Sequence, residues 1–459
     1  MARLVKYLLI VGLAFIVGLV LIFVTANAQR GGALLARLWH EATVTTRAPA
    51  QPPAITTPEL EARGTGAAEV TGVNAAPHRT DTPSLTQTTQ NDPEAMRHDD
   101  DVRPILTKEI FCAIGNEVSL YFDGLVLARD PDAYRFEIDD SGLGGSIERR
   151  RWHLTPRPDQ VGPHRVTVRV SDADGKLLAE ATTRLWILSP QPIEHPANIL
   201  IVGDSTIHQS LVPNQLWTLL NAWSPGSVRF IGTHHPVPDL PIYRKPLPGV
   251  FHEGYGGWAW QTFASHYEPG QEKVYKLPRS PFVFLEDGRP TLDVGRYLQE
   301  QGARGKLNAA VFDLGINDTF SANPDDPRSL DASIAAALEW ADKLLHGFQD
   351  AAPEAALVIL LPPPFTRSKA VFQRRYGSIQ PEFGDPWRHR RVVQTLGRRM
   401  IEHFDGHAPQ IKLIPMNAML DTVDGYWAVD PGHPNEAGGL QIAAALFAVI
   451  ANALDNSTR

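Results

Sequence analysis

A serine, an aspartate and a histidine in this chain have the residue types and the setting of a catalytic triad. Ser205 follows the apolar run at residues 199–202, and Asp430 stands three residues before His433 in the segment DPGHPN. Histidine has the basicity to take the proton of a serine hydroxyl, and a carboxylate can fix its tautomer and stabilise its charged form. Taken alone, GDS and DPGH are also typical of turns and helix caps. The triad hypothesis therefore needs support from elsewhere in the chain.

Two further segments contain donors that could stabilise the oxyanion formed when a serine attacks an acyl carbon. The first is the glycine-rich HEGYGGW at residues 252–258, where glycine leaves room for a substrate to approach the backbone. The second is LGIND at residues 314–318, which contains Asn317. The backbone N–H of Ser205, a backbone N–H from the glycine loop and the side-chain amide of Asn317 can converge on one oxygen. Together the four segments supply the parts of a serine hydrolase.

Buried strands that alternate with helices must position these segments. The apolar runs that we interpret as strands are residues 199–202, 228–231, 309–314, 357–361 and 411–414. Helical stretches lie between and after them, the clearest at residues 329–348, 387–404 and 436–454. This alternation predicts a five-stranded, parallel, doubly wound sheet covered by helices on both faces. Reactive groups in such a sheet belong just past the carboxyl ends of the strands, where all four segments fall.

The four segments, in this order, resemble the four consensus blocks of the SGNH (GDSL) hydrolases. The resemblance covers residues 198–455, just over half of the chain. It implies a flavodoxin-like three-layer α/β/α fold and hydrolysis of esters or thioesters with no metal or other cofactor. It also implies roles for five residues: Ser205 as nucleophile, Asp430 and His433 as its triad partners, and Gly257 and Asn317 as oxyanion donors.

Aromatic residues near the glycine loop bear on the substrate. Gly257 is preferred over Gly256 as the oxyanion glycine because it directly precedes Trp258, as in relatives with an EG-x-x-GW segment. Trp258, Trp260 and Trp427 are candidates to stack on a sugar ring, although aromatic residues are more often part of a core. Two polar inserts, residues 263–310 and 365–389, emerge on the same side and can shape the mouth of the site.

Three segments precede the hydrolase-like region at residues 197–459. Residues 1–28 begin with two basic residues and a run of 18 uncharged ones, which predicts a signal peptide or a transmembrane anchor and an exported protein. Residues 29–103 have the Pro/Thr/Ala-rich composition of a disordered linker. Residues 104–190 show period-two patterning with a hairpin turn at Asp174 and Gly175, which predicts a small all-β, Ig-like sandwich.

The overall composition excludes several classes of protein. The formal charge is −8 with no long basic stripe, so we expect no nucleic-acid partner. The single cysteine, Cys112, excludes an intramolecular disulfide and a cysteine-based zinc site. His234, His235 and His252 are close in sequence but lack a further ligand pattern, so no metal is expected. Membrane contact is expected through residues 7–24 alone, if they are not cleaved.

These features favour an exported esterase that removes short acyl groups, acetyl above all, from carbohydrates. One alternative keeps the triad but acts on lipids or other acyl esters. Another is a membrane-anchored polysaccharide O-acetyltransferase with the same triad. A third is a binding protein with an inert α/β domain, which the presence of all five candidate residues argues against. The sandwich can bind a glycan or serve as a packed spacer.

Overall fold

The computed structural model describes residues 100–456, except residue 239 and residues 270–276 and 378–383. The predicted N-terminal segment, residues 1–28, and most of the predicted linker lie outside the described residues. The described part of the linker is held in place. Asp100 accepts hydrogen bonds from the Arg129 backbone N–H (2.9 Å) and the Tyr134 hydroxyl (2.9 Å).

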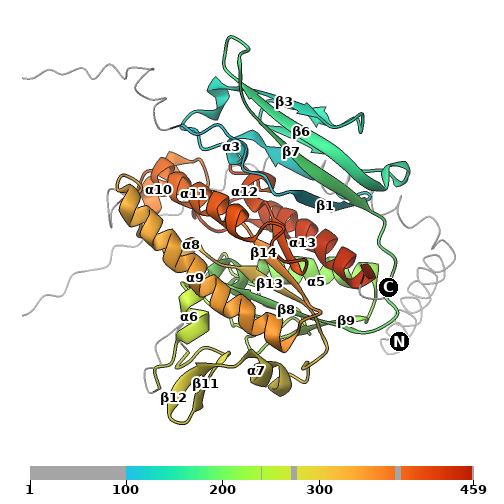
Figure 1. Cartoon of the computed structure of the whole chain (residues 1–459), viewed down its shortest axis with the longest axis vertical. Coiled ribbons are helices and arrows are strands. Elements are labelled where there is room, and N and C mark those ends of the chain that lie inside the picture. The colour runs from blue at the N-terminus through green and yellow to red at the C-terminus, as the bar shows by residue number, and fades with distance from the viewer. Residues whose placement is uncertain (1–99, 239, 270–276, 378–383, 457–459) are drawn as a thin grey trace, which may run out of the picture. The chain divides into compact units, whose positions relative to one another are not determined.

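A parallel sheet forms the centre of the hydrolase-like region (Figure 1). Its path runs from β8 through β13 and β14 to β15, and β9 pairs with the other edge of β8. The bounds are β8 Ala197–Gly203, β9 Val228–Ile231, β13 Leu307–Asp313, β14 Ala356–Leu360 and β15 Ile411–Ile414. The strand order, counted along the chain, is therefore 2-1-3-4-5, which is the flavodoxin-like order. The predicted fold class is confirmed.

The structure adds a sixth strand to the five that the sequence predicted. β10, Glu253–Gly254, pairs in parallel with Val202 and Gly203 of β8, beyond the stretch of β8 that pairs with β9. A strand of two residues shows no hydrophobic period, so the sequence pattern could not reveal it. Its effect is to fix the start of the glycine loop against the carboxyl end of β8.

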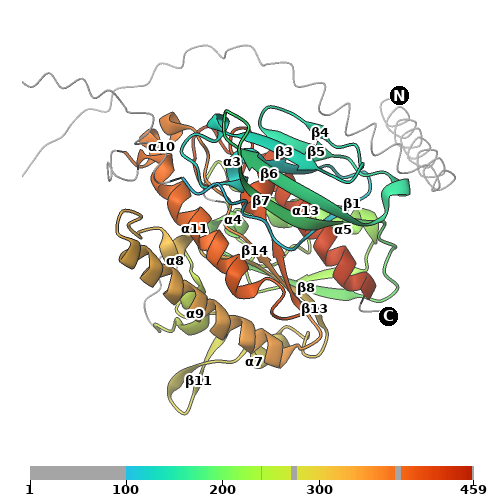
Figure 2. The same ribbon diagram turned by 45° about the horizontal axis from the view of Figure 1, so that its top comes forward.

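Helices cover both faces of this sheet (Figure 2). Successive residues of β8 point to opposite sides: Ile199 and Ile201 join one hydrophobic cluster, and Leu200 and Val202 join the other. The first cluster contains α5 (Leu211–Trp223) and α13 (Glu436–Asn456). The second contains α6 (Trp260–Ser265), α7 (Val294–Glu300), α9 (Pro327–Ala351) and α11 (Pro386–Phe404). This is the three-layer arrangement that the fold class requires.

Short helices and a hairpin complete the hydrolase-like region. The short helices are α4 (Ser205–His208), α8 (Ile316–Thr319), α10 (Lys369–Arg375) and α12 (Met416–Met419). The first predicted insert contains the hairpin of β11 (Val283–Glu286) and β12 (Arg289–Leu292). Among the described residues, one helix, α13, is long and apolar enough to cross a membrane, and 67% of its apolar window is buried inside the protein. That burial is typical of a core helix.

Two sheets precede the hydrolase-like region. One has the order β1-β7-β6-β3, with β1 Glu109–Ala113, β7 Leu177–Leu188, β6 Gly162–Ser171 and β3 Arg135–Asp139. The other has the order β2-β5-β4, with β2 Val118–Tyr121, β5 Arg151–Leu154 and β4 Ser146–Ile147. β6 and β7 form the expected hairpin, and Val166, Val168 and Val170 are buried on one side of it.

The two sheets are packed directly against the α/β layers. Residues of β1, β2, β5 and β6 belong to the same hydrophobic cluster as α13 and one face of the parallel sheet. The Asn417 side-chain amide donates to the carbonyls of Ile105 (3.0 Å) and Gly124 (3.0 Å) across this contact. Arg150 makes a two-pronged ion pair with Asp421, at 2.8 and 3.1 Å. The sheets and the α/β layers thus share one core.

Candidate active site

Ser205 is placed at the turn between β8 and α4. β8 ends at Gly203, and Asp204 caps α4 by accepting a hydrogen bond from the Thr206 backbone N–H (2.9 Å) on its Oδ1. Ser205 is partly exposed, whereas Asp204 and Thr206 on either side are buried. A serine in the first turn of a helix after a buried strand, with its side chain accessible, is well placed for attack on a substrate.

Asp430 and His433 form a bonded pair. Asp430 Oδ1 lies 2.9 Å from His433 Nδ1, and it also accepts the backbone N–H groups of Gly432 and His433, each at 3.0 Å. Burial raises the pKa of Asp430, but these hydrogen bonds and the charge of a protonated His433 outweigh it and lower the pKa below its usual value. The carboxylate is therefore ionised and can fix the imidazole with Nε2 as the proton acceptor.

His433 acts electrostatically on the strand end that carries Ser205. Burial raises the pKa of Asp204, the residue directly before Ser205, and the charge of His433 offsets part of that rise. Within the described residues, no hydrogen bond joins Ser205 to His433. Such contacts are often long before a substrate binds and tighten afterwards. The structure thus brings the three predicted triad residues to the same end of the sheet, and their roles stay predictions.

Asn317 joins the β8 turn to the glycine loop. Its Nδ2 donates to Asp204 Oδ2 (3.1 Å) and to the carbonyl of Trp258 (3.0 Å). Gly315, at φ +118°, makes the turn from β13 into α8 that presents Asn317. Both hydrogens of the Asn317 amide are donated to acceptors in this structure. The amide must therefore give up one of these two hydrogen bonds in order to donate to an oxyanion.

The glycine loop leaves open space beside this amide. Gly257 has φ +76°, and a side chain added at Gly257 or Gly256 would meet no atom within 4 Å. An L-residue at Gly257 would therefore be strained by its backbone conformation, not by its neighbours. The positive φ distinguishes Gly257 from Gly256.

Two buried carboxyl groups, which the sequence pattern alone did not single out, lie behind Ser205. Burial raises the pKa of Asp204 to about 6, against the opposing effects of the Thr206 N–H and the charge of His433. Burial, and then the charge of Asp204, hold the pKa of Asp313 far above its usual value. Asp313 Oδ2 has no hydrogen-bond partner within the described residues. The segments GDS and DLGIND contain these carboxyls, and they could have shown that each of two adjacent parallel strands has an aspartate at or directly after its last residue.

A group of histidines lies beside α4. His234 Nε2 is 2.9 Å from His208 Nδ1, and His252 Nε2 is 3.2 Å from the Ser210 hydroxyl. Burial and then the charges of His208 and His235 lower the pKa of His234 to about 4. In the described part of the chain, no cluster of three or more histidine, cysteine, aspartate or glutamate side chains is arranged to hold a metal ion.

The sequence prediction for Trp258 and Trp260 is wrong. Trp258 is 3% exposed and packs on Tyr255, and Trp260 is 1% exposed and stacks on Phe312. They belong to the core because the glycine loop turns inward as α6 begins, so neither can stack on a sugar ring. Trp427 is half-buried beneath the Arg244 guanidinium, 5.1 Å from the ring centroid. Its place beside the Asp430–His433 segment keeps it a candidate.

The fold and the four segments at its carboxyl edge agree with the class predicted from the sequence. No protein-family model matches the chain, and no curated protein matches it. Solved structures that it resembles include a carbohydrate esterase of family 3 from Talaromyces cellulolyticus, with 16% identity over 57% of this chain and 99% of that one, at a TM-score of 0.35. A carbohydrate acetylesterase from Sinorhizobium meliloti has 14% identity over 56% and 99%, at 0.29. An aryl esterase from M. smegmatis has 17% identity over 56% and 99%, at 0.26.

The fold class rests on the strand order of the parallel sheet, and the site rests on the contacts described above.

Proposed function

We propose that the protein is a serine esterase of the SGNH type. The observation that carries this proposal is the bonded Asp430–His433 pair at the same sheet edge as Ser205. A charged carboxylate bonded to Nδ1 leaves Nε2 free to accept a proton, and it stabilises the imidazolium that then forms. Asn317 and the open glycine loop supply donors beside it.

The proposed reaction proceeds through an acyl-enzyme. The Ser205 hydroxyl oxygen attacks the acyl carbon while its proton passes to His433 Nε2, and Asp430 stabilises the imidazolium. The oxyanion is met by the backbone N–H of Ser205, the N–H of Gly257 and the amide of Asn317. His433 then protonates the departing alcohol. Water, deprotonated by His433, attacks the acyl-enzyme, releases the carboxylic acid and restores the Ser205 hydroxyl.

We further propose that the substrates are short acyl esters of carbohydrates. Because Trp258 and Trp260 are buried, they do not support a carbohydrate substrate. Three supports remain: the exported location that residues 1–28 predict, the β-sheets that accompany the site, and Trp427 beside His433. The two inserts are polar and charged, which disfavours a long apolar trough for a lipid chain.

Residues 1–28 also lead us to propose a periplasmic or extracellular protein, secreted or anchored by its N-terminus. If the N-terminal segment stays in the membrane as an anchor, a membrane-bound O-acetyltransferase is the alternative function. The two activities use the same acyl-enzyme and differ in whether water or a sugar hydroxyl accepts the acyl group.

A series of nitrophenyl esters and one acetylated polysaccharide test the proposal. For a short acyl pocket, kcat/KM should fall from acetyl to longer chains, by about 1–3 kcal/mol for each methylene that is not accommodated. The Ser205→Ala variant gives the background rate. Preference for octanoyl over acetyl esters would contradict the carbohydrate assignment and favour the lipid esterase. Transfer of acetyl to an unacetylated glycan, with little free acetate, would favour the transferase.

A further inference from the structure

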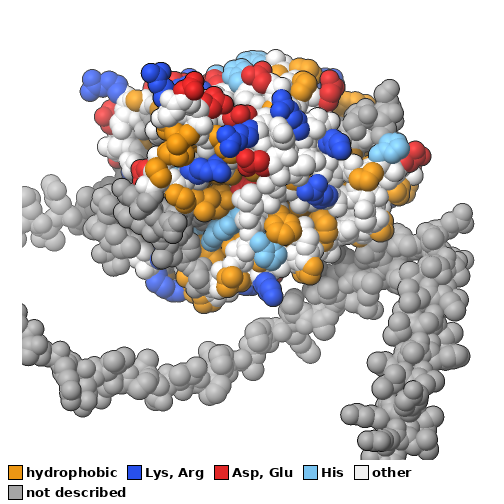
Figure 3. All heavy atoms as spheres, turned by 90° about the horizontal axis from the view of Figure 1, so that it is seen from below, with side chains coloured by type: hydrophobic (Ala, Val, Ile, Leu, Met, Phe, Trp, Pro, Cys, Tyr) orange, Lys and Arg blue, Asp and Glu red, His pale blue; other side chains and the backbone are white. Residues whose placement is uncertain are grey.

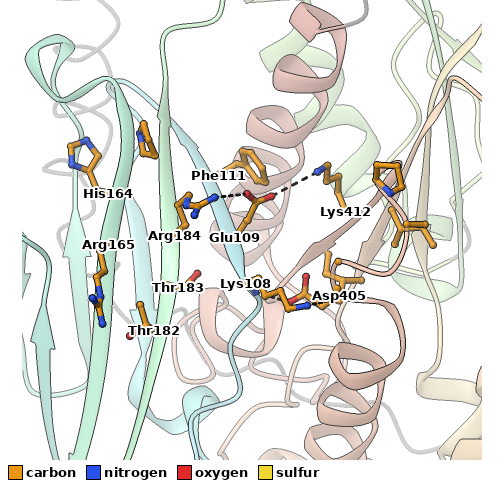
Figure 4. Close-up of a pocket in the computed structure, with 16 residues that line it drawn as sticks. Lys108, Glu109, Phe111, His164, Arg165, Thr182, Thr183, Arg184, Asp405 and Lys412 are labelled. Atoms are coloured by element: carbon orange, nitrogen blue, oxygen red, sulfur yellow. Dashed lines mark hydrogen bonds and ion pairs between the residues drawn. The ribbon is translucent and has the colours of Figure 1, made fainter.

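A groove remote from Ser205 lies between the four-stranded sheet and the α/β layers (Figure 4). Its volume is about 880 Å³, within the ~300–1,000 Å³ range of ligand sites. We call it the basic groove and define it by its charged lining: Lys108, Glu109, Arg165, Arg184, Asp405 and Lys412. Four of these are cations and two are carboxylates, so the lining has an excess of positive charge in a chain whose formal charge is −8.

Both carboxylates of the basic groove are already occupied. Glu109 lies 3.7 Å from Arg184 and 3.7 Å from Lys412, and it accepts a hydrogen bond from the Trp186 indole (3.0 Å). Asp405 accepts the backbone N–H of Lys108 (2.6 Å), and the Lys108 ammonium donates to the Asp405 carbonyl (2.6 Å). Figure 4 shows the contacts of Glu109 with Arg184 and Lys412 and those between Lys108 and Asp405. The excess positive charge is therefore not cancelled within the lining.

Arg165 is the cation that these bonds do not reach. No described residue pairs with its guanidinium, and it stands directly opposite Arg184 in the β6–β7 register. Side chains opposite each other in an antiparallel pair lie on the same face, and like charges in that position are destabilising. Arg184 is 59% exposed at its side chain, so the pair is open to solvent. Glu109 already meets the charge of Arg184, so an anion in the groove would pair first with Arg165.

The basic groove is separate from the proposed active site. Lys412 lies near the amino end of β15, whereas Ser205 follows the carboxyl end of β8. The strands from β8 through β13 and β14 to β15 all run parallel. The amino end of β15 and the carboxyl end of β8 therefore lie at opposite ends of the strands. Strands of this length span about 17 Å. A ligand in the groove would thus leave Ser205 open.

We propose that the basic groove binds a carboxylate-bearing stretch of a polysaccharide. Guanidinium groups bind carboxylates through two parallel hydrogen bonds, and Arg165 and Arg184 bring two such groups to the groove from facing backbone positions of the hairpin. Lys412 extends the positive lining to the α/β side, and Thr182 adds a hydroxyl to it. By contrast, acidic and basic side chains are interspersed on the face shown in Figure 3.

The choice of a polysaccharide as ligand rests on the proposed function. An esterase that holds its polymer at a second place meets acyl groups at a higher local concentration. The substrate class that we infer is therefore an acidic polysaccharide that carries acyl esters.

Calorimetric titration of the full chain with a hexamer of galacturonate tests the basic groove, with cellohexaose as the neutral comparison. The galacturonate hexamer should bind, cellohexaose should not, and binding should weaken as salt is raised. The double variant Arg165→Glu and Arg184→Glu should weaken binding by about tenfold or more, because each charged hydrogen bond is lost and replaced by repulsion. Turnover of a small acetyl ester should be unchanged in this variant.

A charge-matched control separates the groove from net charge. Arg149→Glu and Arg328→Glu change residues that are 84% and 97% exposed and lie outside the groove, so they should leave binding intact. Equal binding by the groove variant, equal affinity for cellohexaose, or no binding at all would overturn the proposal. Equally tight binding of a polyphosphate of the same charge would show an unselective anion site and overturn the polysaccharide assignment. Binding is read without turnover, so failure of the esterase proposal leaves this test intact.

Discussion

Replacing Asp204 by asparagine should change how the stability of the protein depends on pH. The folded chain raises the pKa of Asp204 from 3.8 to about 6, chiefly because the carboxyl is buried. Between those values the unfolded chain releases a proton that the folded chain keeps. Asp204 therefore contributes stability that is fully present below pH 3.8 and is lost as the pH rises toward and through 6. The Asp204→Asn variant has no such titration.

The magnitude follows from the shift. One pKa unit corresponds to about 1.4 kcal/mol, so a shift of roughly two units removes about 3 kcal/mol in all, of which about 2 kcal/mol falls between pH 4 and pH 7. The free energy of unfolding of Asp204→Asn, relative to the unmodified chain, should thus rise by about 2 kcal/mol over that range. The variant also removes the charge that raises the pKa of Asp313, which can only increase the difference.

Urea unfolding followed by tryptophan fluorescence at pH 4, 5, 6 and 7 measures this difference. Asp326→Asn is the matched control, because Asp326 caps α9 as Asp204 caps α4 but its side chain is 47% exposed. A constant offset between Asp204→Asn and the unmodified chain at all four pH values would refute the reasoning. It would mean that the carboxyl behind Ser205 ionises as it does in water.

Three further predictions follow from the contacts. Asn317→Ala should lower kcat by about 100-fold with little change in KM, and a raised KM at constant kcat would instead make Asn317 a binding residue. Asn417→Ala should lower the free energy of unfolding by about 1–3 kcal/mol, because it leaves the buried carbonyl of Ile105 without a donor and that of Gly124 with only the Gln394 amide at 3.4 Å, and an unchanged urea midpoint would contradict this. N-terminal sequencing of the mature protein should find Met1 in the membrane fraction if residues 7–24 remain as an anchor, whereas a start at Gln29 would indicate secretion.

The sequence was sufficient for the parts of the fold that repeat a strong pattern. The five strands are short, mainly apolar runs, and the β6–β7 hairpin alternates polar and apolar residues, so the hydrophobic pattern identifies them. The two-residue β10 has no period and becomes a strand through its contact with β8. The extent of packing between the sheets and α13 depends on long-range contacts such as Asn417 with Ile105, which no local pattern contains.

The candidate site was predictable where short segments carry the chemistry. Ser205, Asp430 and His433 stand in such segments, and the structure places all three at one sheet edge. The exposure predicted for Trp258 and Trp260 was wrong because a glycine-rich segment is compatible both with a solvent-facing loop and with a turn into the core. Packing of Trp258 against Tyr255 and of Trp260 against Phe312 favours the turn into the core.

Neither the buried carboxyls nor the basic groove could be predicted from local sequence patterns, because both depend on contacts between separate strands. The altered pKa of Asp313 depends on its burial beside Asp204, a residue more than 100 positions away in the chain. Likewise Arg165 and Arg184 become neighbours through the hairpin register, and Lys412 joins them from another sheet.

Covalent labelling of Ser205 tests the central claim most directly. The full chain is incubated with a fluorophosphonate, digested, and analysed by mass spectrometry. We expect one modified site, at Ser205, with loss of ester turnover in proportion to labelling. The reaction should be much slower in His433→Ala, which lacks the base that activates the hydroxyl. Esterase activity that persists in Ser205→Ala, or complete inactivation with Ser205 unmodified, would contradict the account.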